Sequence, residues 1–258
     1  LSAAGFVNVL ISFNVSDADG AGDINASKAI VNFTLGTPGF SQHYANVSAV
    51  TTSEIGTCKN SSTSANSVNI NCTVVLPYYS NASDKWVVNI SVPDRTGAVG
   101  RNDTVTFTIS TLSSLTLLNS SINYSSVNAG ASDVAASPIL LNNTGNDDFD
   151  QINITASALV GTTTSSDEVA VTSFYANITN AVAGAGVQLA TSPIILRELV
   201  QPSGETVFNA TLTHGHTSAF APNADKGNRT IYFWVDIPGG LRAQLYNATW
   251  NLTVVNNP

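Results

Sequence analysis

Apolar and polar side chains alternate along most of this chain, and the alternation constrains the fold more than any other feature of the sequence. Near the C-terminus, Ala248, Trp250, Leu252 and Val254 fall on one face of an extended chain, with asparagine and threonine between them. Period-two alternation is typical of a strand with one buried face, and long helical patterns are absent. The chain is therefore expected to be all-β.

Similar runs recur along the chain, with turn pairs such as Asp19-Gly20 and Pro38-Gly39 between them. The other predicted strands are Phe6–Val15, Ala29–Leu35, Val68–Leu76, Trp86–Val92, Thr104–Ile109, Gln151–Ala158, Glu168–Ile178, Val187–Leu196, Thr206–Thr213 and Thr230–Ile237. Short strands with regular turns favour antiparallel sandwiches. A Ser/Thr/Leu-rich connector at Ser110–Leu118 predicts a division into domains of residues 1–112 and 113–258, each of a size suited to one sandwich.

The N-glycosylation tripeptide Asn-x-Ser/Thr is far commoner than chance placement would make it. It contains 18 of the 28 asparagines, where the serine and threonine content would give only about 6. The candidate acceptors are Asn14, Asn25, Asn32, Asn46, Asn60, Asn71, Asn81, Asn89, Asn102, Asn119, Asn123, Asn142, Asn153, Asn177, Asn209, Asn228, Asn247 and Asn251. Such acceptors indicate a secreted, glycan-coated surface, and the alternative is a Ser/Thr/Asn-rich β protein with coincidental matches.

The middle residue of the tripeptide is apolar in 13 of the 18 cases. In a strand, the first and third positions share a face and the second points the other way. The asparagines are therefore expected to face solvent while the residues that follow them fill the core.

Cys58 and Cys72 are the only two cysteines. In a secreted chain an isolated pair this close in sequence predicts a local disulfide, and two free buried thiols are the alternative.

Composition excludes several classes of function. A formal net charge of −8 with only 9 Lys+Arg offers no basic surface for nucleic acid. No apolar run approaches the ~18 residues of a membrane-spanning helix. The common hydrolase, metalloprotease, P-loop and dinucleotide-binding motifs are absent, so no enzymatic activity and no cofactor are expected.

Two loops, one acidic and one with two histidines, are candidate metal sites. Asp17, Asp19 and Asp23 could bind calcium through carboxylate oxygens, although Asp-Gly is also a common turn pair and the plain turn is favoured. His214 and His216 lack an identifiable third ligand, which favours a solvated loop.

Several stretches resemble Ig-like modules of archaeal cell-surface glycoproteins, particularly those of small-genome archaea. In the first half these are Phe13–Gly20, Cys72–Tyr79 and Trp86–Asp94; in the second they are Ser121–Tyr124, Gly130–Asp133 and Leu141–Asn146. The resemblance implies two tandem Ig-like β-sandwich domains in an extracellular protein, with no catalytic residues.

The first predicted strand carries no acceptor asparagine before Asn14 and is apolar on much of both faces. Its candidate contact residues are Phe6, Val7, Val9, Leu10, Ile11 and Phe13. It is expected either to be an ordinary first strand or to be donated to a neighbouring copy, head to tail, which would build a filament. The predicted function is a pilus-like or thread-like filament subunit that binds itself. The alternative is an adhesive or ligand-binding ectodomain of a cell-surface or S-layer glycoprotein, with a cell-surface or glycan ligand.

Overall fold

The computed structural model describes residues 1–35, 42–45, 58–180, 186–199, 207–209, 211–214 and 227–256. In this part of the chain the helical elements are two three-residue 3-10 turns, η1 (Ala26–Lys28) and η2 (Val171–Ser173), and all other regular elements are strands. All the strand pairs described are antiparallel. The all-β prediction is confirmed. None of the described helical turns has the length and apolar character needed to span a bilayer.

The described residues form two compact units, each with its own hydrophobic core. The first comprises Leu1–Ser114 together with Thr144–Asp147, and the second comprises Leu115–Asn143 together with the described residues from Asp148 onward. The inclusion of Thr144–Asp147 in the first unit was not foreseen from the sequence.

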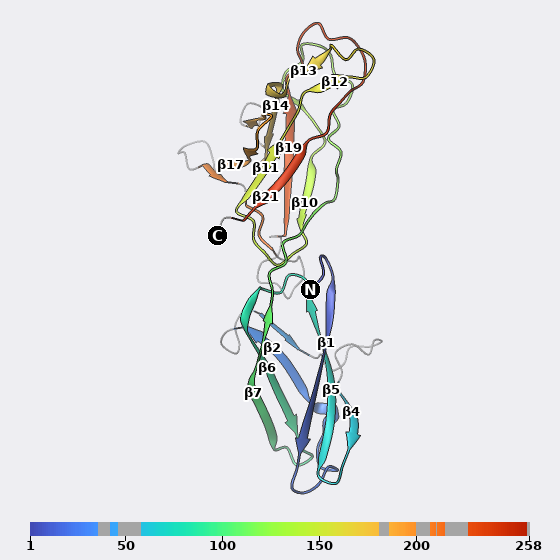
Figure 1. Ribbon diagram of the computed structural model, residues 1–258, viewed down its shortest axis with the longest axis vertical. Coiled ribbons are helices and arrows are strands. Elements are labelled where there is room, and N and C mark those ends of the chain that lie inside the picture. The colour runs from blue at the N-terminus through green and yellow to red at the C-terminus, as the bar shows by residue number, and fades with distance from the viewer. Residues whose placement is uncertain are drawn as a thin grey trace. The chain divides into compact units, whose positions relative to one another are not determined.

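The first unit contains two antiparallel sheets (Figure 1). One has the order β1-β5-β4, with bounds Phe6–Ser16, Ser67–Pro77 and Cys58–Thr63. The other has the order β3-β2-β6-β7, with bounds Gln42–Ala45, Ile30–Leu35, Ser83–Pro93 and Val99–Ile109.

The core of the first unit follows from the alternation in its central strands. Phe33 on β2, Ile70 on β5 and Trp86 on β6 are completely buried. The Phe33 ring lies 4.8 Å, centroid to centroid, from that of Phe107 on β7. Burying each of these large side chains removes enough apolar surface from water to stabilise the fold by about 1.5–3 kcal/mol.

The segment Thr144–Asp147 completes the first unit through a buried side chain, that of Asn146. Its Oδ1 accepts the backbone N–H of Leu112 at 2.6 Å, and its Nδ2 donates to the carbonyls of Ser80 at 2.8 Å and Ser110 at 3.2 Å. Because a buried polar group is costly unless it is paired, these contacts make this segment an integral part of the unit.

The second unit contains shorter strands. Its largest sheet has the order β15-β14-β19-β10-β8, and β9 also pairs with β19. Strand β15 is Val187–Gln188, β14 is Phe174–Asn177 and β19 is Asn228–Val235. Strand β10 is Ile139–Asn143, β8 is Leu115–Leu117 and β9 is Val134–Ala135. Phe174 and Phe233 are buried at its centre, and the Trp250 ring contacts both, at 5.0 and 6.0 Å between centroids.

Three smaller sheets complete the second unit. Their orders are β16-β11-β21, β13-β12-β20 and β17-β18. In the first, β16 is Ile194–Ile195, β11 is Gln151–Thr155 and β21 is Asn251–Val255. In the second, β13 is Glu168–Val169, β12 is Leu159–Gly161 and β20 is Tyr246–Asn247. In the third, β17 is Arg197–Leu199 and β18 is Val207–Asn209.

The predicted strands agree best with the structure where the alternation is long. The predictions for β1, β2, β5, β6 and β19 each overlap most of the observed strand. In contrast, the predicted strand Glu168–Ile178 is interrupted, because η2 separates β13 from β14. The predicted strand Val187–Leu196 is likewise split into β15 and β16, which belong to different sheets.

Candidate functional site

Strand β1 lies at the edge of its sheet, and within the described part of the chain only β5 pairs with it. The pairing runs unbroken from Phe6 opposite Pro77 to Ser16 opposite Ser67. The first strand therefore belongs to the sheet of its own chain in this structure.

The backbone hydrogen bonds at both ends of β1 show which residues face the outer edge. The N–H of Tyr78 donates to the carbonyl of Gly5, and the N–H of Asp17 donates to the carbonyl of Asn66, each at 2.9 Å. In an antiparallel ladder, residues that bond to the partner strand alternate with residues that do not. The odd-numbered residues of β1 therefore bond to β5, and the even-numbered residues direct their N–H and C=O groups outward.

The even-numbered residues also carry their side chains on the solvent face. Phe6 and Leu10 are each 63% exposed, which is unusual for large apolar side chains on a strand. We call Phe6, Asn8, Leu10 and Ser12 the β1 edge. Among the described residues its outward backbone groups have no partner strand, and it also exposes apolar surface; an added strand binds to these two features.

The inner face of β1 is less covered than that of its neighbour. Its apolar residues pack against the core but are only half-buried, whereas the inward residues of β5 are at most 4% exposed. The β1 residues concerned are Val7, Val9, Ile11, Phe13 and Val15. The core of the first unit is therefore incompletely closed along this strand.

The exposure of the candidate acceptor asparagines follows the position of their strands in the sheets. The exposed ones on strands all lie on edge strands, namely Asn14, Asn60, Asn102, Asn247 and Asn251. Those on interior strands are half-buried or buried, namely Asn32, Asn71, Asn89, Asn142, Asn153, Asn177 and Asn228. An interior strand has side chains on both sides of each asparagine, so it leaves less room for a glycan.

The remaining acceptors lie outside the strands or outside the described side chains. Asn119 and Asn123 are exposed, and Asn25 and Asn81 are half-buried. Asn46 lies outside the described residues, and Asn209 is described by its backbone alone.

Asn177 departs from the expected solvent-facing orientation. Its side chain is only 1% exposed, and its Oδ1 accepts the N–H of Ile178 at 2.7 Å. The hydroxyl of Thr179, in the same tripeptide, also donates to this oxygen at 3.4 Å. The asparagine thus stabilises the chain reversal at the end of β14, a role that period-two alternation does not anticipate.

The predicted disulfide is present between Cys58 and Cys72. The two residues lie directly opposite each other on β4 and β5. The bond ties the polar edge strand β4 to the centre of its sheet.

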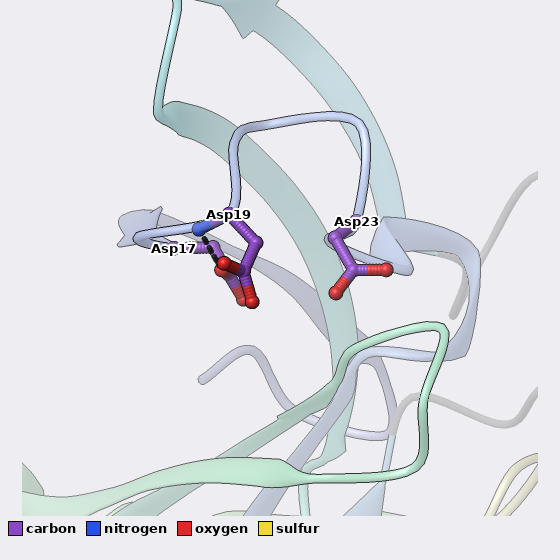
Figure 2. Close-up of side chains that lie close together, drawn as sticks. All are labelled: Asp17, Asp19 and Asp23. Carbon is purple, nitrogen blue, oxygen red and sulfur yellow. Dashed lines mark hydrogen bonds between the residues drawn. The ribbon is translucent and has the colours of Figure 1, made fainter.

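The aspartates considered for calcium lie close together in the loop after β1. Each of Asp17, Asp19 and Asp23 offers one carboxylate oxygen within 4.8 Å of the others (Figure 2). One oxygen of Asp17 accepts the N–H of Asp19 at 2.8 Å. Calcium takes six to eight oxygens, so these three carboxylates would form only part of its coordination shell.

Of the two histidines considered for a metal, His216 lies outside the described residues. The Nδ1 of His214 lies 2.6 Å from an Oδ1 of Asp148, and the same oxygen accepts the backbone N–H of His214 at 2.7 Å. This double contact anchors residues 211–214 within the second unit.

Comparison with protein families, with curated proteins and with solved structures finds no match to this chain.

Proposed function

We propose that this protein is a non-enzymatic, N-glycosylated extracellular structural protein. In this proposal it is the subunit of a filament, and neighbouring copies are joined by addition of a β-strand at the β1 edge. The observation that carries the proposal is the exposed edge of β1, beside which no other described strand lies.

The order of the strands in the first unit supports this proposal. An Ig constant-type sandwich pairs strands A, B, E and D in one sheet and C, F and G in the other, and variable-type domains extend the second sheet with C′. Reading β1 to β7 as B, C, C′, D, E, F and G reproduces both observed orders. The described residues contain no counterpart of strand A, whose place in an Ig-like sandwich is beside B. That place is the β1 edge.

The distribution of acceptor asparagines also favours the β1 edge as the contact. The edge strands β4, β7 and β21 carry an exposed acceptor within their first half, at Asn60, Asn102 and Asn251. On β1 the acceptor is Asn14, near the end of the strand, and Phe6–Phe13 is free of them. Glycans at these positions would block strand addition at β4, β7 and β21 and leave the first part of β1 accessible.

The cell-surface location rests on the acceptor asparagines together with the disulfide. Disulfides persist in oxidising compartments, and N-glycans are attached to secreted chains. Nothing in the proposed assembly requires a metal, and calcium at the loop after β1 would be an accessory to it.

Substitution at Leu10 tests the proposal. Leu10→Lys places a charge on the edge, and Leu10→Pro removes an N–H that faces outward without removing a bond to β5. Ile30→Lys is a matched control, because Ile30 is 44% exposed on β2, a strand that is paired on both sides. We expect the unsubstituted protein and Ile30→Lys to form filaments in negative-stain micrographs. Both Leu10 variants should form at least about tenfold less sedimentable polymer.

Circular dichroism and thermal melting would confirm that the variants fold. Filaments formed equally well by the folded Leu10 variants would refute the β1 contact. A monodisperse monomer of the unsubstituted protein that binds a cell-surface glycan or protein would instead support the adhesive ectodomain.

A further inference from the structure

Two pairs of candidate acceptor asparagines lie directly opposite each other on adjacent strands, one pair in each unit. Asn32 on β2 is opposite Asn89 on β6. Asn142 on β10 is opposite Asn228 on β19. The members of each pair are distant in sequence and are brought together by strand register.

Both pairs lie on the face of the sheet turned away from the core. In the first unit, Val31, Phe33 and Val88, the residues flanking the pair, are at most 4% exposed. In the second unit, the inward neighbours Leu141 and Ile231 are also buried. The four acceptor side chains therefore point toward solvent, but each is half-buried by its neighbours.

A third strand lies beside one member of each pair. Ala45 lies opposite Asn32 on the side away from Asn89, and Thr116 lies opposite Asn142 on the side away from Asn228. The Nδ2 of Asn89, the atom to which a glycan would be attached, donates to the hydroxyl of Thr34 at 2.7 Å.

A third acceptor adds to the crowding in the first unit. Asn102 on β7 lines the same depression as Asn32 and Asn89, together with Ile90, Ser91, Arg101 and Asp103.

Directly opposite residues of an antiparallel pair have Cβ atoms about 4.5–5.5 Å apart. Two sugars attached at this spacing, on side chains that are already half-buried, would compete for the same space above the sheet. Their hydroxyl groups would then lose water without gaining matched partners, which is unfavourable. One sugar at the same place can remain hydrated on both faces.

We propose that in the folded protein each of these pairs carries a glycan on one asparagine at most. The inference rests on the proposed N-glycosylation and is independent of the proposed filament. It means that the acceptors of the two pairs are modified as alternatives, whereas Asn60, on the edge strand β4, is modified independently.

Glycopeptide mass spectrometry of the folded protein, purified with its native glycans, tests the inference. We expect the occupancies of Asn32 and Asn89 to sum to no more than one glycan per chain, and likewise those of Asn142 and Asn228. Replacing the more occupied member of a pair by glutamine should raise the occupancy of the other by up to the fraction removed. The matched control is Asn60→Gln, which should leave the occupancies of both pairs unchanged.

Near-complete occupancy of both members of a pair in folded protein would overturn the inference and leave the proposed glycosylation standing. An unchanged occupancy of the remaining member after the glutamine substitution would also overturn it. If Asn14, Asn60 and Asn251 are bare as well, the proposed glycosylation fails together with the inference.

Discussion

Cys58 on β4 lies directly opposite Cys72 on β5, and the disulfide between them holds a strand that has almost no apolar side chains of its own. Every residue of β4 after Cys58 is exposed. The covalent bond and the backbone ladder, with little help from side-chain burial, therefore keep β4 in its sheet.

Removal of the disulfide is expected to destabilise the first unit. The double variant Cys58→Ser/Cys72→Ala should lose about 3 kcal/mol in free energy of unfolding, the value for closing a loop of this size. Denaturant titration with and without a reducing agent measures the loss. The unsubstituted protein should respond to the reducing agent and the variant should not; a variant as stable as the oxidised protein would contradict the prediction.

A methyl group at Gly145 is expected to disrupt the segment that returns to the first unit. A Cβ there would overlap the carbonyl oxygen of Leu112 and lie 2.9 Å from the backbone nitrogen of Ser114. Because backbone cannot move aside cheaply, Gly145→Ala should cost about 1–3 kcal/mol, as overpacking commonly does. Gly239→Ala is the control, since nothing lies within 4 Å of its added Cβ. Thermal melts of the two variants would distinguish them, and equal melting temperatures would refute the prediction.

The β6–β7 hairpin is expected to depend on pH through Asp94. Desolvation by itself raises the pKa of Asp94, but hydrogen bonds from Thr96, Ala98 and Gly97 to the ionised carboxylate outweigh it and hold the pKa below its usual value. A lowered pKa in the folded state stabilises the fold above the ordinary carboxyl pKa, and this contribution is lost as pH falls through the lowered value.

Asp94→Ala should therefore lower the melting temperature at pH 7, with a smaller effect for Asp94→Asn, whose side-chain oxygen can still accept hydrogen bonds. The difference between the unsubstituted protein and Asp94→Asn should shrink below about pH 4. A difference that stays constant from pH 7 to pH 2 would show that ionisation of Asp94 does not contribute.

Loss of the acceptor on the edge strand β7 is expected to cause nonspecific association. Val105 on β7 is 51% exposed, so Asn102→Gln would leave an apolar edge without its glycan. When the glycosylated Asn102→Gln variant is concentrated, its light scattering should rise severalfold. Asn123→Gln, which removes an exposed acceptor outside the strands, is the control and should behave like the unsubstituted protein. The prediction fails if the two variants associate equally.

Local features of the sequence account for much of the fold and part of the candidate sites. The cysteine spacing identified the disulfide, and the exposed positions of Phe6 and Leu10 agree with the two apolar faces of the first predicted strand. Strand β4 was missed because its sequence after Cys58, Lys-Asn-Ser-Ser-Thr, has no apolar alternation. The predicted solvent-facing orientation of Asn177 was wrong, because its hydrogen bonds at a chain reversal override the alternation.

Alternation by itself determined that this chain forms strands and which faces of the long strands are buried. The reason is that successive side chains of a strand point to opposite faces of the sheet. The order of the strands was decided by tertiary structure alone. Among the described strands, that order leaves β1 with a neighbour on one side only. It also places Asn32 and Asn142 on interior strands, each opposite a second acceptor. These relationships join residues far apart in sequence, and only packing around a shared core sets which strands become neighbours and in which register.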